Sequence, residues 1–381
     1  MSAVPEHIGE QAAPEETAET WQPVPTLGGG EYHLPEVWVQ EQQRVFGAEW
    51  ICVGREEEFP ERGDYITRDV GTESVIVVRA NDGTLRCFYN VCAHRGTRLC
   101  DGEGHADSGV IKCPYHAWTY DTEGTLVGTP NIPSSEGFDR SSRPLWRAAV
   151  AAWNGFVFVN LATEPETFGS FLDRNCEGNP TAFLANWQLA DLRIGYRIDY
   201  EVQANWKVIV DNYNECLHCP SVHPELVALV PTFRSGMTEG DEGAALAEGA
   251  TTLTASGTSN RPPLPGLAPE QRAIYAGNML YPTLMINVQS DCAMTYRLEP
   301  LGPDRSRIVS EYLFHPDTIA RSEFDPADVV AMWDLISRQD WAVCERAQKG
   351  MHSRAYADGG VYPFNDRWIA AFNDRYRLSM G

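Results

Sequence analysis

The sequence predicts an α+β protein of two domains, in which an all-β domain precedes a larger domain of mixed helices and strands. The chain of 381 residues is long enough for two domains with separate cores. Between about residues 51 and 161, short runs with β propensity alternate with turn signals, and after Leu161 long helical stretches mix with strands. We therefore expect a tail and leader helix at 1–44, the all-β domain at 45–162 and the α+β domain at 163–381.

The composition is typical of a globular protein, with 43% hydrophobic and 10% aromatic residues. Residues 1–20 are acidic and lack the apolar core of a signal peptide, and the chain has no run of about 18 apolar residues. We therefore expect a cytoplasmic protein without membrane association. The formal net charge of −23 argues against a nucleic-acid partner, because binding of phosphates needs a basic face.

The N-terminal part of the chain contains a predicted tail, a helix and several strands. Residues 1–30 are rich in Pro, Glu, Ala and Gly, a composition that predicts a mobile or loosely docked tail. Apolar residues at spacings of three and four over Glu36–Trp50 predict a leader helix. Farther on, the sequences NDG at residues 81–83 and NG at residues 154–155 each adjoin runs with strand propensity, and they favour tight turns between antiparallel strands.

Two segments of the second domain are distinctive. Residues 238–270 are rich in Gly, Ala, Ser and Pro and are too long for an ordinary connection, so they predict either a lid or a disordered surface loop. The last clear helix runs from Pro326 to Lys349. Asp325 can cap it, Pro326 suits its first position and Gly350 can end it.

The β domain contains two short loops that each pair one cysteine with one histidine. They are Cys92-Ala-His94 and Cys113-Pro-Tyr-His116. Four such residues could hold one zinc ion tetrahedrally, or they could hold a [2Fe–2S] cluster with two thiolates on one iron and two imidazoles on the other. Core thiols are the expectation for the cysteines that match no ligand motif: Cys52, Cys87, Cys100, Cys176 and Cys292.

These loops resemble the CxHRG and CPYHxW loops of the Rieske domain in aromatic-ring-hydroxylating and related oxygenases. The resemblance implies a Rieske [2Fe–2S] cluster. It assigns Cys92 and Cys113 to the iron that stays ferric, and His94 and His116 to the redox-active iron. Imidazole ligands in place of thiolates raise the reduction potential and couple reduction to a proton.

A second constellation lies in the α+β domain, in the stretch from Asp211 to His223. His218 and His223 stand five residues apart, and Pro220 between them interrupts the helix. With a carboxylate from elsewhere they can form a facial triad that leaves positions on iron(II) open for dioxygen and substrate. Zinc binding through Cys216 and Cys219 stays open, whereas c-type haem attachment requires a CxxCH sequence that this stretch lacks.

This stretch resembles the E-x-x-H-x4-H segment of Rieske oxygenase catalytic domains, which are helix-grip-like α+β domains. The resemblance implies that His218 and His223 bind the mononuclear iron and that Glu215 bridges it to a Rieske histidine. We name Asp211, in the same stretch, as a second candidate catalytic residue. The family pattern makes Asp340 the third ligand. Glu345 is the alternative, because the two side chains lie about 140° apart on one helix and cannot both face the iron.

The resemblance also implies partners and a mode of assembly. The chain has no GxGxxG fingerprint, so NAD(P)H is expected to act only indirectly, through a reductase or ferredoxin that donates electrons. Family members pass electrons between neighbouring subunits, which implies a homotrimer with His116 of one subunit facing Glu215 of the next. A Rieske electron carrier is the distant alternative, and the presence of a whole second domain argues against it.

For the substrate we expect a quaternary ammonium compound of the betaine, choline or carnitine type, hydroxylated beside nitrogen and thereby N-demethylated. The stretch NYNECLHCP, with Glu at the bridging position, resembles the oxygenases of these compounds. Hydroxylation or demethylation of an aromatic compound is the alternative, and insertion of one or two oxygen atoms stays open. An aromatic cage holds a permanent cation well. The candidates for such a cage are Trp333, Tyr281, Tyr296, Phe364 and Trp368, although ordinary core packing is the more common role for an aromatic residue.

Overall fold

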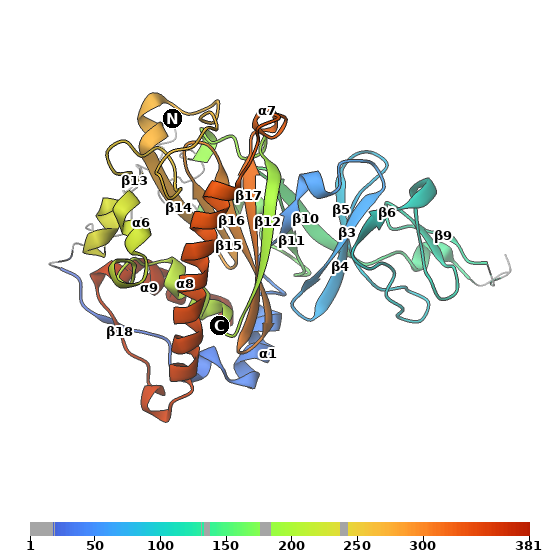
Figure 1. Cartoon of the computed structure of the whole chain (residues 1–381). Helices are drawn as coiled ribbons and strands as arrows, with labels where there is room; N and C mark the ends of the chain where they lie inside the picture. Colours follow the sequence, from blue (N-terminus) through green and yellow to red (C-terminus); the bar gives the residue numbers. More distant parts are fainter. Residues whose placement is uncertain (1–17, 19, 131, 133–137, 176–183, 237–242) are drawn as a thin grey trace, which may run out of the picture.

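The computed structural model describes residues 18, 20–130, 132, 138–175, 184–236 and 243–381. An elongated β domain lies on the right in Figure 1, and a larger domain of helices packed on a sheet lies on the left. No helix in the described ranges is long and apolar enough to cross a membrane. This arrangement agrees with the predicted order of an all-β domain followed by an α+β domain.

The β domain consists of a large and a small antiparallel sheet. The large sheet has the order β2-β11-β10-β5-β4-β3-β6, and the small sheet has the order β7-β8-β9. The strands are β2 (Ile51–Arg55), β3 (Asp64–Val70), β4 (Glu73–Arg79), β5 (Leu85–Tyr89), β6 (Glu103–His105), β7 (Val110–Lys112), β8 (Thr119–Asp121), β9 (Leu126–Gly128), β10 (Arg147–Trp153) and β11 (Phe156–Asn160). Asn154 and Gly155 have φ values of 51° and 79° and form the expected tight turn between β10 and β11.

The second domain is built on a six-stranded antiparallel sheet in the order β12-β17-β16-β15-β14-β13. Its strands are β12 (Arg193–Val202), β13 (Ala244–Ala245), β14 (Ile274–Leu280), β15 (Leu284–Val288), β16 (Ala293–Gly302) and β17 (Arg305–Phe314). Helix α8 (Ala327–Met351) crosses one face of this sheet in Figure 1. It buries apolar side chains at spacings of three and four, including Val329, Trp333 and Ile336. Asp325 accepts a hydrogen bond from the backbone N–H of Ala327 (2.9 Å), but the N-cap residue of α8 is Pro326 rather than Asp325. The helix also continues through Gly350 to Met351, so the predicted cap, first position and end are each wrong by one or two residues.

The remaining helices complete the domain around α8. They are α2 (Phe168–Asn175), α4 (Trp206–Tyr213), α5 (Cys219–Val222), α6 (Pro224–Leu229), α7 (Pro316–Ile319) and α9 (Arg367–Met380). Short 3-10 turns are η1 (Gly29–Tyr32), η5 (Pro231–Ser235), η6 (Pro269–Ala273) and η8 (Phe364–Asp366). The four cysteines expected to be core thiols and lying in the described ranges, Cys52, Cys87, Cys100 and Cys292, are buried. Cys176 lies outside the described residues.

The prediction of a mobile or loosely docked tail is wrong for the described residues from 24 onward. Strand β1 (Val24–Pro25) pairs with β18 (Val361–Tyr362), and Leu27 is completely buried. The glycine run that follows is needed for close packing, because a Cβ atom on Gly29 would lie 2.6 Å from a backbone oxygen of α8. Residues 1–17 and 19, which belong to the predicted tail, lie outside the described residues.

The leader helix α1 (Pro35–Arg44) is shorter than its sequence pattern and is held by a buried ion pair. Glu41 of α1 and Lys207 of α4 form this pair, and both side chains are fully buried. The Glu41 carboxylate also accepts hydrogen bonds from Trp206 Nε1 (3.1 Å) and the Tyr376 hydroxyl (2.9 Å). The pair therefore joins the N-terminal segment to α4 and α9.

We expect Glu41→Ala to lower the free energy of unfolding by about 3–5 kcal/mol, because it leaves the Lys207 ammonium buried without its partner. Urea denaturation followed by circular dichroism measures this loss. The double variant Glu41→Met, Lys207→Met removes both charges and is expected to recover much of the stability. Wild-type stability for Glu41→Ala would show that the ion pair does not hold α1 in place.

Residues 243–268 do not form the disordered surface loop that was one prediction for residues 238–270. Leu253 and Leu264 are buried within the core. Asp291, itself buried, accepts hydrogen bonds from Thr252 Oγ1 (2.6 Å) and Arg261 Nε (2.9 Å). These contacts fix the segment against the end of the sheet. Residues 238–242 lie outside the described residues, and a role as a lid stays a prediction.

Candidate metal centres

The two cysteine–histidine loops of the β domain lie beside each other. Cys92 and Cys113 are both buried, and the imidazole centroids of His94 and His116 lie 4.7 Å apart. Burial raises the pKa of the Cys92 thiol, and the neighbouring Cys113 thiol adds to the rise. Each loop thus brings its cysteine beside the cysteine of the other loop and its histidine beside the other histidine.

One buried atom of this group lacks a hydrogen-bond partner within the described ranges, which fits a site for a metal cluster. His116 Nδ1 is buried and has no hydrogen-bond partner among the described residues, and buried polar atoms of this kind are uncommon in folded proteins. A bound iron would give this nitrogen a partner. Trp118 stacks on His94 with centroids 4.7 Å apart, and the Tyr120 hydroxyl lies 3.4 Å from Cys92 Sγ. The four side chains therefore suit the Rieske [2Fe–2S] cluster that the resemblance implies.

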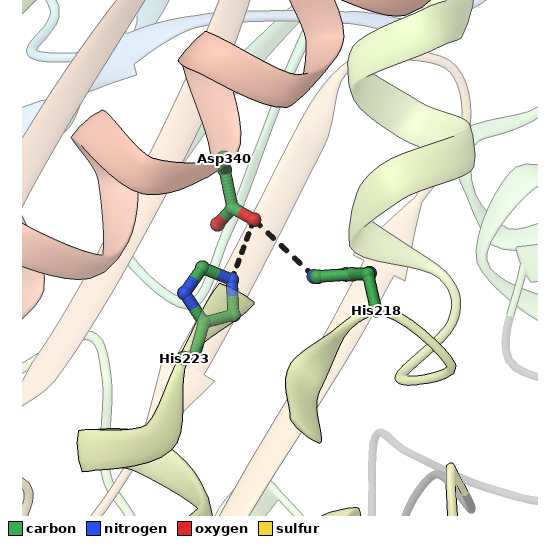
Figure 2. A group of neighbouring side chains, drawn as sticks. All are labelled: His218, His223 and Asp340. Carbon is green, nitrogen blue, oxygen red and sulfur yellow. Dashed lines mark hydrogen bonds and ion pairs between the residues drawn. The ribbon is translucent and has the colours of Figure 1, made fainter. Parts of the chain in front are cut away.

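The second group joins two short helices to α8. His218 precedes α5, His223 stands between α5 and α6, and Asp340 lies in the middle of α8. Pro220 stands in the first turn of α5, where proline is tolerated, so it does not interrupt a helix as predicted. Pro224 begins α6 and disfavours helical backbone at the residue before it, so α5 ends at His223. Figure 2 shows the Asp340 carboxylate pointing at one nitrogen of each ring.

The distances in this group suit a single metal ion. Asp340 Oδ1 lies 2.7 Å from His223 Nε2 and 3.2 Å from His218 Nε2, and one ligand atom of each residue lies within 4.8 Å of the others. Two ligand atoms about 2.1 Å from one metal and at right angles to each other are about 3 Å apart. The geometry thus matches the predicted two-histidine, one-carboxylate triad. Figure 2 shows Asp340 reaching the two rings from α8, whereas both histidines come from the ends of α5.

The electrostatics of the group also favour a bound cation. Burial disfavours the ionised form of Asp340, but the two histidines outweigh burial and hold its pKa below the usual value. Burial likewise disfavours the charged form of His218, yet hydrogen bonds to Asp340 and Glu215 raise its pKa to about 10. The site therefore retains positive charge between two carboxylates, and a metal ion can supply that charge in place of a proton.

Glu215 holds His218 from the side opposite Asp340. Its Oε1 lies 2.5 Å from His218 Nδ1, and its Oε2 accepts a hydrogen bond from the backbone N–H of His218 (3.2 Å). The Glu215 side chain is 15% exposed. The carboxylate therefore orients a candidate ligand and also reaches the surface, as a bridging group must.

Two other predicted residues lie outside the triad. Asp211 accepts a hydrogen bond from the Tyr32 hydroxyl (2.7 Å), and burial raises its pKa to about 7. Within the described ranges no hydrogen bond or ion pair joins Asp211 to the triad. Glu345, the alternative third ligand, accepts a hydrogen bond from the backbone N–H of Gln203 (3.1 Å) instead. The structure thus favours Asp340 over Glu345.

The zinc alternative for Cys216 and Cys219 is wrong in this structure, because the two residues form a disulfide. A disulfide sulfur carries no thiolate to bind zinc. The bond links the residue after Glu215 to the residue after His218. It therefore fixes the turn that carries both groups.

The five aromatic residues predicted for a substrate cage have different surroundings. Trp333 is buried on α8, two turns before Asp340, and its ring centroid lies 6.0 Å from that of Tyr275. Tyr296 also lies beneath α8, with its hydroxyl 2.5 Å from Ser337 Oγ.

The other three candidates contact the C-terminal region. Tyr281 packs on Phe372 of α9 with centroids 5.6 Å apart, and Phe364 packs on Trp21 with centroids 6.1 Å apart. Trp368 is 48% exposed on α9. Trp333 and Tyr296 are thus the two candidates that lie on or beneath the helix that carries Asp340, and a role in substrate binding stays a prediction for all five residues.

Comparison with known proteins agrees with both centres. A model of the Rieske [2Fe–2S] domain matches residues 49–142, and a model of the ring hydroxylating alpha subunit (catalytic domain) matches residues 189–381. The chain is 29% identical over 382 residues to the glycine betaine monooxygenase oxygenase subunit of Chromohalobacter salexigens, covering 92% of this chain and 84% of that protein. It is 31% identical over 321 residues to the carnitine monooxygenase oxygenase subunit of Escherichia coli K12, covering 84% of this chain and 82% of that protein.

A solved structure is also similar to this chain along nearly its whole length. The quaternary ammonium Rieske monooxygenase CntA, in complex with γ-butyrobetaine, shares 26% sequence identity with it and has a TM-score of 0.74. The match covers 98% of this chain and 100% of the CntA chain. A cluster domain followed by a mononuclear iron domain defines an oxidoreductase that activates dioxygen. The chain belongs to the Rieske non-haem iron oxygenases, as an oxygenase component.

Proposed function

We propose that this oxygenase hydroxylates a quaternary ammonium compound of the betaine, choline or carnitine type at a carbon next to nitrogen. The observation that carries the proposal is the similarity over nearly the whole chain to CntA, which was solved with γ-butyrobetaine bound. The relatives named for glycine betaine and carnitine support the same substrate class. For an N-methyl group, one dioxygen, two electrons and two protons yield the N-hydroxymethyl product and water. That product then breaks into formaldehyde, an amine and a proton.

In this proposal Cys92, Cys113, His94 and His116 hold the cluster, and His218, His223 and Asp340 hold the iron. When bound, the cluster supplies single electrons and the iron activates dioxygen. The protein orients these ligands. Glu215 fixes the ring of His218.

We further propose that the chain works as a cytoplasmic homotrimer served by a separate reductase or ferredoxin that takes electrons from NAD(P)H. Exposed apolar side chains beside both ends of the proposed electron path support contact between subunits. Tyr115, next to His116, is 58% exposed, and Leu217, between Glu215 and His218, is 44% exposed. Burial of these two side chains where subunits meet would favour such a contact, because removing apolar surface from water is favourable.

A substrate panel tests the proposed function. We expect coupled oxygen uptake with glycine betaine, proline betaine, choline or carnitine, and formaldehyde release wherever an N-methyl group is the one oxidised. The assay combines purified chain, a generic reductase and each compound, and it identifies products by mass. Benzoate-like and polycyclic compounds form the comparison set. Coupled turnover with the aromatic set alone would assign the protein to the aromatic substrates instead.

A further inference from the structure

We propose that Gln339 is a positioning residue of the mononuclear centre that fixes the ring of His223 and makes the two histidine ligands unequal donors. Gln339 directly precedes Asp340 on α8. Unlike the ligand motifs, it has no sequence signature, and its contact appears only in the folded chain. The inference rests on the proposed iron site and adds the group that sets the properties of one ligand.

The contacts of His223 determine which of its two ring nitrogens carries the proton. His223 is 1% exposed, its Nε2 lies 2.7 Å from Asp340 Oδ1, and its Nδ1 lies 2.7 Å from Gln339 Oε1. Figure 2 shows one ring nitrogen facing Asp340 and the other facing away. An amide oxygen only accepts hydrogen bonds, so Nδ1 must carry the proton and donate. The lone pair on Nε2 is then free for a metal.

A second contact decides which end of the Gln339 amide faces the histidine. Gln339 Nε2 lies 3.4 Å from Glu225 Oε2 on α6. An ionised carboxylate only accepts hydrogen bonds, so it selects the NH₂ end of the amide and turns the oxygen toward His223. Glu225 lies two residues after His223, and Gln339 lies one residue before Asp340. The two contacts therefore tie α6 to α8 at the metal centre.

The two histidines have different partners behind them. His218 Nδ1 faces the Glu215 carboxylate at 2.5 Å, whereas His223 Nδ1 faces the neutral amide of Gln339 at 2.7 Å. A charged acceptor strengthens the hydrogen bond and raises the basicity of the ligand nitrogen more than a neutral one. His218 is therefore the stronger donor and His223 the weaker. A carboxylate at position 339 would remove this difference.

The test compares Gln339→Leu and Gln339→Glu with wild type in iron binding rather than in turnover. The mononuclear iron is removed with a chelator from protein that keeps its cluster, and Fe(II) affinity is measured anaerobically by chelator competition. We expect Gln339→Leu to bind Fe(II) about 10–100-fold more weakly. Gln339→Glu is made together with Glu225→Gln, so that the new carboxylate does not face the Glu225 carboxylate. We expect this variant to bind at least as tightly as wild type, because its carboxylate accepts the same hydrogen bond from His223. Gln43→Leu makes the same change on an exposed face of α1 and should bind like wild type.

A spectroscopic measurement separates positioning from general damage to the fold. Nitric oxide added to the Fe(II) protein gives an EPR signal whose symmetry depends on the ligands, and we expect it to change in both Gln339 variants. Wild-type affinity and an unchanged signal in Gln339→Leu would overturn the inference. If Gln339→Leu does not fold, weaker binding by the folded double variant Gln339→Glu, Glu225→Gln overturns it instead. Failure of the wild-type protein to bind iron at this site would overturn the proposed function. This outcome concerns the wild-type protein alone and is therefore distinct from the results for the two Gln339 variants.

Discussion

Replacing Asp340 with alanine is expected to lower coupled turnover by more than about 100-fold while the cluster spectrum stays intact. Loss of a group that merely orients a ligand already costs about 10–100-fold, and Asp340 is itself a proposed ligand. Its Oδ1 lies within 3.2 Å of both histidine rings, so its removal leaves two ligands and an open site. The cluster is unaffected because its four side chains lie in the other domain. Oxygen uptake measures turnover, and EPR of the reduced protein reports the cluster.

Glu345→Ala is the matched control for this experiment. Glu345 lies five residues farther along α8 and accepts a hydrogen bond from the backbone of Gln203. We expect this variant to keep its turnover and its mononuclear iron. Activity in Asp340→Ala together with inactivity in Glu345→Ala would show that the third ligand has been assigned to the wrong carboxylate.

Glu215→Gln is expected to keep both metals but to slow electron transfer between them by more than about tenfold. The amide oxygen of the new side chain can still accept a hydrogen bond from His218 Nδ1, so the ring stays in place. The amide lacks the negative charge that strengthens the hydrogen bonds from the imidazole N–H groups on either side of a bridge. Stopped-flow absorbance of the reduced cluster in a single turnover with oxygen and substrate measures the rate.

The matched control for Glu215 is Glu345→Gln, the same chemical change at a carboxylate outside the triad. We expect its transfer rate to equal that of wild type. A wild-type rate in Glu215→Gln would refute the bridging role. Loss of the mononuclear iron in that variant would instead mean that the charge of Glu215 is needed to hold the iron ligand.

The ligand groups could be predicted from the sequence because each is a short motif whose spacing is part of its chemistry. Cys92 and His94 share one loop, and His218 and His223 flank one proline. Asp340 stands more than a hundred residues away and was found only through resemblance to the family pattern. The structure then brings its carboxylate to 2.7 Å from His223.

Contacts between distant parts of the chain could not be predicted. The glycine run at residues 28–30 predicts flexibility, yet it allows the backbone to approach α8 closely. Residues 243–268 have the composition of a loop, yet they are held by Asp291, which lies beyond them in the sequence. The contact of Gln339 with Glu225 likewise joins residues that are far apart in the sequence, so no local pattern predicts it. The helical pattern likewise does not show that Trp333 is buried on α8 while Trp368 is exposed on α9.

Metal and sulfide analysis of the purified chain, together with EPR, shows whether it is an iron oxygenase with two separate metal centres. We expect about three irons and two acid-labile sulfides per chain, with a Rieske-type signal on reduction. We also expect Asp340→Ala to retain about two irons, both sulfides and the same signal. Zinc in place of iron, with no acid-labile sulfide and no signal on reduction, would show that the chain holds neither centre.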